Sequence, residues 1–410
     1  MSKTIKIFFI LCFVVLHNFF CFSATDSFCA EPDKLKSMMA LTYLQGYFKA
    51  PEKTNVTLYN RLLSDKGYNL YSSGHAAYAA LIDMKGHLLH EWSYPVKKIW
   101  PDKTFDTTTP FWENIYLYPN GDLLAIYHNG GIIKIDKDSR LLWSYDCSAH
   151  HDIDVDSQGN IYTLTNDWIK LKAGVAIIDN AILILSPDGK LVKKIPFTAL
   201  LHRSQNRNAE SLLKRVVGMA LNGTQDVYHT NTLQIIDDKT AVAHSPIFKK
   251  GHILISILTL STIAVIDPDL QDILWILGPR LWVEGQHNTT LLANGNMMTF
   301  DNHYQSQKNH SRVLEFKPLS KEIVWEYKPK DFFTDTHGSE QRLSNGNTLI
   351  VEANKGRVIE VTASKEIVWE FLNPHKTGKD NDLIGAIFAM YRIDPASTSS
   401  WLKDSLPDRI

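Results

Sequence analysis

Six copies of one short pattern dominate this 410-residue sequence. Each copy is an apolar run, a short polar turn and a second apolar run that commonly ends near Trp. The copies are LIDMKGHLLHEW (81–92), KIDKDSRLLWSYD (134–146), ILSPDGKLVKKI (184–195), VIDPDLQDILWIL (265–277), EFKPLSKEIVWEY (315–327) and EVTASKEIVWEF (360–371). β-branched and aromatic residues around a short polar turn are typical of a β-hairpin. One such hairpin cannot bury its apolar face alone, so a recurring hairpin predicts stacked repeats.

The spacing of the copies predicts the architecture. Counted from equivalent strand residues, the steps are 53, 50, 81, 50 and 45 residues. A second hairpin with a turn of the Asn-Gly kind precedes most copies: YPNGDLLAIY (118–127), DSQGNIYTLT (156–165), LANGNMMTFD (292–301) and LSNGNTLIVE (343–352). Such turns favour tight hairpins. Two hairpins make four strands, and units of roughly 40–55 residues fit the blades of a propeller. We therefore predict an all-β fold, a six-bladed β-propeller over residues 53–410.

Two segments depart from the repeat. The 81-residue step contains residues 197–223, whose Leu and Val spacing with basic residues between predicts a helical insertion. A seventh blade could lie only in this step, and its helical composition argues against one. A sandwich would not usually repeat its hairpins at this period. Residues Val56–Tyr59 resemble a strand that could close the ring against the last blade.

The N-terminus predicts export. Lys3 and Lys6 precede an apolar run, and small residues follow, so residues 1–24 read as a signal peptide, with an uncleaved anchor as the alternative. A short N-terminal segment covers residues 25–52, with a helix expected around Leu35–Phe48. The mature protein should be periplasmic or secreted, where Cys29 and Cys147 could pair. A net charge of −1 gives no electrostatic reason to expect nucleic acid or a membrane surface as partner.

Histidines recur at one position of the repeat, eight or nine residues before the turn residue of the inner hairpin. The pairs are Glu113 before Gly121, His151 before Gly159, His229 before Asp238, His287 before Gly295 and His337 before Gly346. The innermost strand of each blade lines the channel of a propeller, and equivalent offsets mean equivalent places around the ring. Four imidazoles and one carboxylate should therefore converge at one end of the channel. The alternative is that they are solvated strand ends.

Three kinds of chemistry are open to such a cluster. Neutral imidazoles with a carboxylate bind metal ions, and an imidazole can act as acid, base or nucleophile. Protonated imidazoles can hold an anion. Arginine favours the anion, because a guanidinium repels a metal and binds sulfate or phosphate through two N–H groups. Arg312 and Arg357 open the strands after the His287 and His337 hairpins, with a solvated strand end as the alternative for each.

Over most of its length the chain resembles the bacterial aryl-sulfate sulfotransferases, from NVTLYN (55–60) and AALIDMKGHLLHEW (79–92) to HGSEQRLSNGNTLIVEANKGRVIEV (337–361). The specific pieces are QHNTTLLANGNMMTFDN (286–302), the following SRVLEF (311–316), and the HGS-QRL-NGNTL string. The resemblance implies a six-bladed periplasmic propeller. It also implies transfer of a sulfuryl group from an aryl sulfate donor to a phenolic acceptor, without a nucleotide sulfate donor.

The motif match also implies catalytic residues. His337 would be the nucleophile that carries a transient sulfohistidine. His229, His287 and Arg312 would contact the sulfuryl group and neutralise charge on its oxygens. A covalent intermediate predicts ping-pong kinetics.

Further assignments follow from position in the repeat. His151, Glu113 and Arg357 are expected to bind substrate. This chemistry requires no cofactor and no metal, and its partners are the two small molecules. Better-known members have an N-terminal β-domain, for which we expect no counterpart here, so a homodimer stays open. They also have a disulfide close to the active site, whereas this sequence has no cysteine near His337 along the chain, so the need for oxidative folding stays open.

Two other functions compete with sulfuryl transfer. One is a non-catalytic propeller that binds a ligand or protein outside the cytoplasm. The other is a metal- or quinone-dependent oxidoreductase with Glu113 and the histidines as ligands; Arg312 and the lack of an acidic ligand cluster count against it. The insertion 197–223, just before His229, is a candidate lid.

Overall fold

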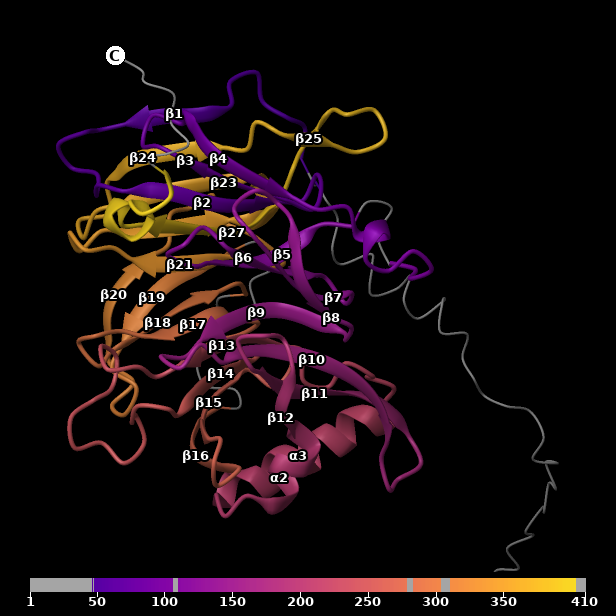
Figure 1. Ribbon diagram of the computed structural model, residues 1–410. Coiled ribbons are helices and arrows are strands. Elements are labelled where there is room, and N and C mark those ends of the chain that lie inside the picture. Colours follow the sequence, from indigo (N-terminus) through magenta and orange to yellow (C-terminus); the bar gives the residue numbers. More distant parts are fainter. Residues whose placement is uncertain (1–45, 47, 106–109, 279–282, 304–309, 403–410) are drawn as a thin grey trace, which may run out of the picture.

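The chain folds into six antiparallel β-sheets arranged in a ring (Figure 1). The computed structural model describes residues 46, 48–105, 110–278, 283–303 and 310–402. The innermost strands of the sheets contact one another in the closed order β27–β5–β9–β13–β17–β21–β27. This confirms the predicted all-β, six-bladed propeller.

The first three blades are built as follows, from the channel outward. Blade 1 contains β27 (Ile387–Ile393), β2 (Tyr68–Ser73), β3 (Tyr78–Ile82) and β4 (Leu88–Ser93). Blade 2 contains β5 (Trp112–Leu117), β6 (Leu123–Tyr127), β7 (Gly131–Ile135) and β8 (Leu141–Tyr145). Blade 3 contains β9 (Ala149–Val155), β10 (Ile161–Lys170), β11 (Ala176–Leu185) and β12 (Leu191–Pro196).

The other three blades follow the same plan. Blade 4 contains β13 (Thr230–Ile235), β14 (Ile253–Ile257), β15 (Thr262–Asp267) and β16 (Asp272–Leu277). Blade 5 contains β17 (His287–Leu291), β18 (Met297–Asp301), β19 (Arg312–Phe316) and β20 (Ile323–Tyr327). Blade 6 contains β21 (Ser339–Arg342), β22 (Thr348–Glu352), β23 (Arg357–Val361), β24 (Ile367–Leu372) and, outermost, β1 (Asn55–Tyr59). The six sequence copies are thus the outer hairpins of the six blades.

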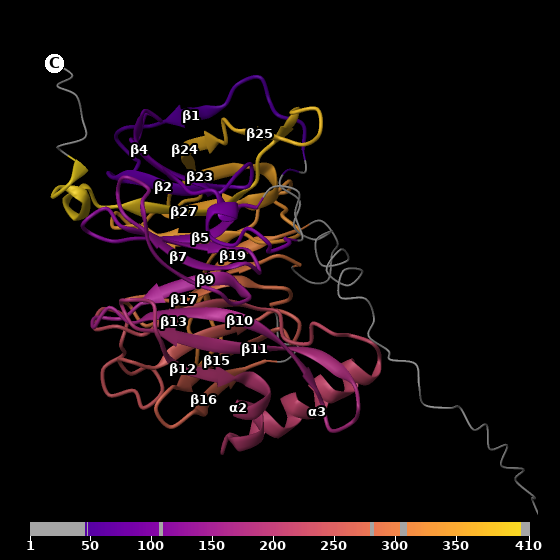
Figure 2. The same ribbon diagram turned by 45° about the vertical axis from the view of Figure 1, so that its right-hand side comes forward.

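Both ends of the described chain close the ring. β1 pairs antiparallel with β24 and adds a fifth strand to blade 6, as predicted for Val56–Tyr59. β27 returns from the C-terminal end to become the innermost strand of blade 1, paired with β2. Figures 1 and 2 show these indigo and yellow segments side by side. Pairing across the junction leaves no gap in the ring, and it brings residues near 390 to the channel.

The recurring Trp of the outer hairpin joins one blade to the next at four of the six junctions. Its indole N–H donates to a backbone carbonyl in a turn of the following blade. The four pairs are Trp92 to Gly121 at 3.1 Å, Trp143 to Pro187 at 3.2 Å, Trp325 to Ala363 at 3.0 Å and Trp369 to Met84 at 3.0 Å. A large apolar ring with one satisfied donor suits a junction that is apolar in its body and polar at its edge.

The predicted insertion contains two helices, α2 (Phe197–Arg203) and α3 (Arg207–Leu221), between β12 and β13. Asn206 caps α3 by accepting from the Asn208 N–H at 3.0 Å. The buried face of α3 (Ala209, Leu212, Val216, Ala220) packs into the apolar core shared by blades 3 and 4. Figure 2 shows both helices at the rim of the ring. Short 3-10 turns occupy Val96–Lys98 (η1), Ala353–Lys355 (η3) and Pro395–Thr398 (η4), and a two-stranded ribbon pairs β25 (Lys376–Thr377) with β26 (Leu383–Ile384).

Some predictions fall outside the described residues. The signal peptide lies wholly outside them. Of the helix expected around Leu35–Phe48, only Gly46 and Phe48 are described, and neither is helical. Cys29 also lies outside, so its pairing with Cys147 stays a prediction. Among the described residues no helix has the length and apolarity needed to cross a membrane.

Polar side chains of the innermost strands join the blades around the channel. At each of the six junctions a side chain bonds the neighbouring inner strand or the residue beside it. The bonds are Tyr391 Oη to Asn114 Oδ1 (2.7 Å), Asn114 Nδ2 to His151 O (2.9 Å), Leu233 N to Asp152 Oδ2 (2.8 Å), Asn231 Nδ2 to Gln286 O (2.7 Å), Asn288 Nδ2 to Glu340 O (2.8 Å) and Arg392 N to Gln341 Oε1 (2.8 Å). This ring of hydrogen bonds fixes the backbone that carries the predicted site.

Candidate active site

The innermost strands are irregular where the predicted histidines stand. The strand register shifts beside Glu113 in β5, beside His151 in β9 and after His287 in β17. His151, His229 and His337 have left-handed backbone φ values of 60°, 47° and 57°. Bulges re-aim side chains, and non-glycine residues in this φ region are uncommon and concentrate at functional sites. The local backbone thus turns these side chains toward the channel.

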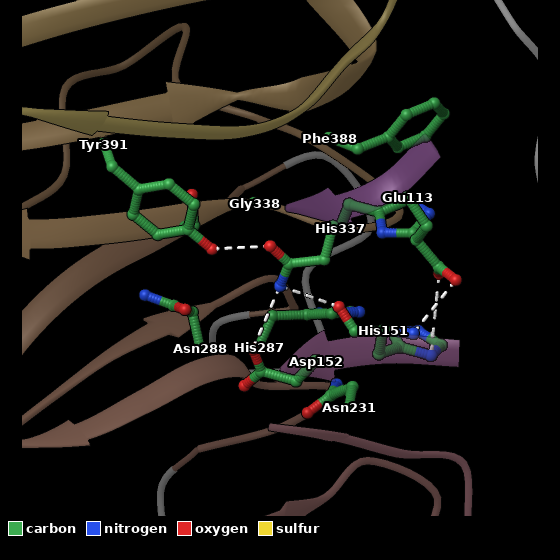
Figure 3. A pocket seen from close by; sticks show the side chains of 12 residues that line it. Glu113, His151, Asp152, Asn231, His287, Asn288, His337, Gly338, Phe388 and Tyr391 are labelled. Atoms are coloured by element: carbon green, nitrogen blue, oxygen red, sulfur yellow. Dashed lines mark hydrogen bonds and ion pairs between the residues drawn. The ribbon is translucent and has the colours of Figure 1, made fainter. Parts of the chain in front are cut away.

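The structure brings the four predicted histidines and Glu113 together at one end of the channel, which we call the histidine end. Ring centroids of His151 lie 5.1 Å from His229, 6.3 Å from His287 and 5.6 Å from His337. Glu113, His151, His287 and His337 line one pocket (Figure 3). His151 also borders a second pocket, which His229 lines. His151 therefore stands between His229 and the other rings.

A carboxylate holds His229. Asp226 Oδ2 lies 2.5 Å from Nδ1 of His229, and Asp226 Oδ1 accepts the His229 backbone N–H at 3.0 Å. Burial alone would lower the pKa of His229, but the charge of Asp226 and the hydrogen bond to it outweigh burial and raise that pKa above its ordinary value. His229 is the ring of the cluster that favours the cationic form.

An amide holds His287. Its Nδ1 lies 2.7 Å from Asn302 Oδ1, so this nitrogen carries the proton and Nε2 is the acceptor. Asn302 Nδ2 in turn donates to the carbonyls of Thr334 at 3.0 Å and His337 at 2.6 Å. Burial, with a contribution from the charge of His337, lowers the pKa of His287 to about 3. His287 is therefore neutral at physiological pH.

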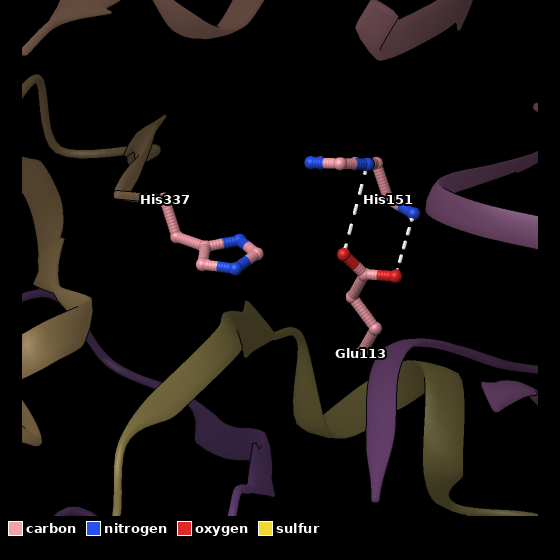
Figure 4. Close-up of side chains that lie close together, drawn as sticks. All are labelled: Glu113, His151 and His337. Carbon is pink, nitrogen blue, oxygen red and sulfur yellow. Dashed lines mark hydrogen bonds and ion pairs between the residues drawn. The ribbon is translucent and has the colours of Figure 1, made fainter. Parts of the chain in front are cut away.

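Glu113 is buried among imidazoles. Its Oε2 accepts from His128 Nδ1 at 2.7 Å and from the His151 backbone N–H at 2.9 Å, while its Oε1 lies 3.6 Å from His151 Nδ1 (Figure 4). Burial alone would raise the pKa of Glu113, but the charges of His128 and His151 and the bond from His128 hold it well below its usual value. The site thus contains a buried carboxylate anion.

His337 stands against aromatic rings. Its ring centroid lies 4.9 Å from that of Phe388 in an edge-on contact, and Phe388 stacks on Phe111 at 4.4 Å. Burial lowers the pKa of His337 to about 4, although Glu113 opposes the shift. A neutral imidazole beside an apolar wall can act as a nucleophile toward a group carried on an aryl ring.

The structure places both predicted arginines away from the histidine cluster. Arg312 opens β19 and Arg357 opens β23, each the third strand from the channel, about two strand spacings or ~10 Å outward. Arg312 Nε donates to Asp301 at 2.8 Å and its Nη1 donates to Glu326 at 2.8 Å. Arg357 is paired with Glu352 and Glu370. Their charges are met by carboxylates within their own blades, and neither arginine lines the two pockets of the histidine end. Their expected contact with the substrate stays a prediction.

Several residues of the site were not predicted. Asp226, Asn302, His128, Phe388 and Tyr391 all contact the cluster or line its pockets. Asp226 is three residues before His229, and Asn302 ends the NGNMMTFDN string. Both could have been predicted from their closeness in sequence to a predicted histidine or turn. Phe388 carried no such signal.

A wider cavity, of about 820 Å³, lies at the other ends of β9 and β13 and is lined by acidic residues such as Asp154, Asp156 and Asp237. None of the predicted site residues (Glu113, His151, His229, His287, His337, Arg312 and Arg357) lines this cavity. We place the candidate site at the histidine end, because titratable groups that converge and have shifted pKa values indicate an active site more strongly than the volume of a cavity does.

Several solved structures match this chain at low sequence identity. A protein of unknown function from Bacteroides caccae matches with a TM-score of 0.51 and 14% identity, over 80% of this chain and 99% of that one. The Dos1 propeller matches at a TM-score of 0.40 and 9% identity, covering 82% and 77% of the two chains. Virginiamycin B lyase from Staphylococcus aureus matches at 0.37 and 15% identity, covering 63% and 69%.

Sequence comparison is more specific. None of the curated proteins matches this chain. The family model "Arylsulfotransferase (ASST)" matches residues 113–374, more than half of the chain and the part that contains Glu113 and all four clustered histidines. The chain therefore belongs to the arylsulfotransferase family.

Proposed function

We propose that this protein transfers a sulfuryl group from an aryl sulfate to a phenolic acceptor, with His337 as the nucleophile. The observation that carries the proposal is the placement of His337: it lines one pocket with His151 and His287, and His229, held by Asp226, lies beyond His151 in the adjoining pocket. The pKa of His337 is lowered to about 4, whereas that of His229 is raised. Membership of the arylsulfotransferase family supports the reaction class.

In the first half-reaction a ring nitrogen of His337 attacks sulfur. The N–S bond forms and the bond from sulfur to the aryl oxygen breaks, so the phenolate leaves with the electron pair. In the second half-reaction a phenolic oxygen attacks the same sulfur, the N–S bond breaks and His337 is regenerated. Two similar displacements replace one difficult transfer, and ping-pong kinetics follow.

His229 fits the role of acid and base. Its Nδ1 is held by Asp226, and we assign proton exchange with the substrate to the other ring nitrogen, Nε2. The cation can give a proton to the departing phenolate and recover one from the acceptor phenol. While protonated, it also offsets the negative charge of the sulfuryl oxygens.

His151 and His287 complete the surroundings of the sulfuryl group in this proposal. Nε2 of His287 is the acceptor nitrogen of a neutral ring fixed by Asn302, so it can accept a hydrogen bond from the hydroxyl of the incoming phenol and position that phenol, but it cannot donate one to the sulfuryl oxygens. Glu113 favours protons on the imidazoles around it, because a buried anion stabilises nearby cations. Phe388 and Phe111 supply an apolar wall suited to an aryl ring.

The test is release of 4-nitrophenol from 4-nitrophenyl sulfate, with and without added phenol. We expect phenol to stimulate release and His337→Ala to lower it by about 10³-fold or more. His375→Ala is the matched control, since this imidazole stacks on His75 outside the cluster. Mass spectrometry of protein mixed with donor alone should find one added sulfuryl group on His337.

Two outcomes would contradict the proposal, one for the transfer reaction and one for the role of His337. Folded wild-type protein that releases no 4-nitrophenol with any of several phenols would favour a non-catalytic binding propeller. Release that survives in His337→Ala would remove His337 from the nucleophile role while leaving transfer itself in place.

A further inference from the structure

One oxygen of the buried Glu113 carboxylate faces the cluster without a hydrogen bond. Glu113 is 2% exposed, and its Oε2 takes the donors from His128 and His151. Its Oε1 makes no hydrogen bond with any residue in the described part of the chain. His151 Nδ1 lies 3.6 Å from this oxygen, which is too long for a hydrogen bond. Buried polar atoms almost always have a partner, so a buried carboxylate oxygen without a hydrogen bond is a candidate ligand for a metal ion.

The groups that face this oxygen are metal ligands. One ligand atom each from Glu113, His151 and His337 lies within 4.8 Å of the others (Figure 4). Metal bonds of about 2.0–2.1 Å in a tetrahedral set place ligand atoms about 3.4 Å apart, close to the 3.6 Å between Glu113 Oε1 and His151 Nδ1. The same His151 nitrogen lies 2.8 Å from His150 Nδ1, so metal binding would replace the hydrogen bond between these two rings. We propose that Glu113, His151 and His337 bind a divalent transition-metal ion such as Zn²⁺.

Hydrogen bonds from neighbouring groups hold the Glu113 carboxylate in an orientation suited to metal binding. His128 and the His151 backbone fix Oε2 of Glu113, which leaves Oε1 directed at the two imidazoles. Such outer contacts are typical of metal sites. The pocket there has a cavity volume of about 30 Å³, room for an ion and one or two waters.

Two imidazoles and one carboxylate select the class of ion. This donor set suits Zn²⁺ and its neighbours in the first transition row better than Mg²⁺ or Ca²⁺, which prefer oxygen ligands alone. Three protein ligands leave a position open for water or another small molecule.

Metal binding and sulfuryl transfer would exclude each other at His337. A nitrogen lone pair that binds a metal cannot attack sulfur. The metal-loaded protein is therefore inactive in transfer, and removing the metal restores activity. The binding itself does not depend on the proposed transferase function.

The test measures binding of Zn²⁺ by chelator-stripped, dialysed protein. We expect one equivalent by calorimetry and elemental analysis, and a Kd at least about 10-fold weaker in Glu113→Gln. His375→Gln, outside the cluster, should bind as wild type does. Less than half an equivalent in wild type, or equal Kd values in Glu113→Gln and the control, would overturn the proposal.

A second measurement covers the case in which Glu113→Gln does not fold. X-ray absorption of the Zn²⁺-loaded wild type should show nitrogen and oxygen ligands that include two imidazoles. A sulfur ligand, or fewer than two imidazoles, would place the ion elsewhere and overturn the site. Absence of transfer by metal-free protein would count against the proposed function alone.

Discussion

His229 and His287 stand at the same position of neighbouring blades but differ in charge. Each precedes or opens the innermost strand of its blade, and each has its Nδ1 held by one side chain. Asp226 raises the pKa of His229, whereas Asn302 leaves burial to lower the pKa of His287 to about 3. The repeat places the ring, and its partner sets the charge.

The partners come from different parts of the fold, which explains why they differ. Asp226 lies in the loop after α3, three residues before His229, and its carboxylate accepts from the backbone N–H and the ring of that histidine. Asn302 follows β18 and must also donate to two backbone carbonyls, those of Thr334 and His337. A carboxylate has no proton to donate there, so blade 5 requires an amide and keeps a neutral histidine.

Arg312 tests the support behind His287. Asp301, the neighbour of Asn302, is fully buried and accepts from Arg312. We expect Arg312→Gln to lower the free energy of unfolding by about 3 kcal/mol, because removing one partner leaves a buried carboxylate uncompensated. Urea unfolding measures it. Arg140→Gln, at an exposed pair, should stay within about 0.5 kcal/mol of wild type.

The same variant separates two roles for Arg312. A positioning role predicts lower stability and kcat with little change in KM for the aryl sulfate. Direct contact with the sulfuryl group, implied by the family resemblance, predicts a large rise in KM with stability preserved. The second result would support direct contact between Arg312 and the sulfuryl group of the substrate.

Asn302→Asp would give blade 5 the partner of blade 4. We expect His287 to gain positive charge, but the free energy of unfolding to fall by about 2–4 kcal/mol, because the carbonyls of Thr334 and His337 lose their donors. Thermal unfolding should show a midpoint lower by roughly 3–5 °C. Asn345→Asp, in an exposed turn, is the control. An unchanged midpoint would refute this reason for an amide.

Asp226→Asn makes the reverse exchange. The new amide would donate to Nδ1 of His229, so the ring proton moves to Nε2 and the ring becomes neutral. We expect kcat with 4-nitrophenyl sulfate to fall by about 100-fold at nearly unchanged stability. Asp238→Asn, exposed and distant, should leave kcat unchanged. A kcat within twofold of wild type would mean that the charge on His229 has no part in the reaction.

The sequence was most informative where the repeat is regular. Hairpin counting predicted six blades and brought Glu113 and four histidines to one place, because a fixed offset from a turn is a fixed height along an inner strand. It could not place Phe388, since β27 pairs with β2 more than 300 residues away. Nor could it place Arg312, because a strand's start reveals its height but not its distance from the channel. Asp301 and Glu326, which compensate it, come from two different strand pairings.

His75 extends the comparison to a histidine outside the cluster. Its Nδ1 bonds the Ser73 hydroxyl at 2.8 Å and its ring stacks on His375 at 4.0 Å. Burial, with the charge of His375, lowers the pKa of His75 to about 4. Between pH 6.5 and 4, His75 therefore binds a proton in the unfolded chain but not in the folded one. The free energy of unfolding falls as pH falls through this window and levels off below it.

His75→Gln removes this dependence while keeping a polar partner for Ser73. Unfolding in urea at pH 7.5 and pH 5 should show a smaller loss for the variant than for wild type. The difference should be below about 1 kcal/mol, because the ring is partly open to solvent and screening weakens the effect. His375→Gln should change the loss in the same direction, since burial lowers the pKa of His375 too and the variant also removes the stacked charge beside His75. For His229 and His287, the side chain bonded to Nδ1 decides whether burial lowers the pKa of the ring. If all three proteins lose the same free energy of unfolding between pH 7.5 and pH 5, this relation does not extend to an imidazole bonded to a hydroxyl.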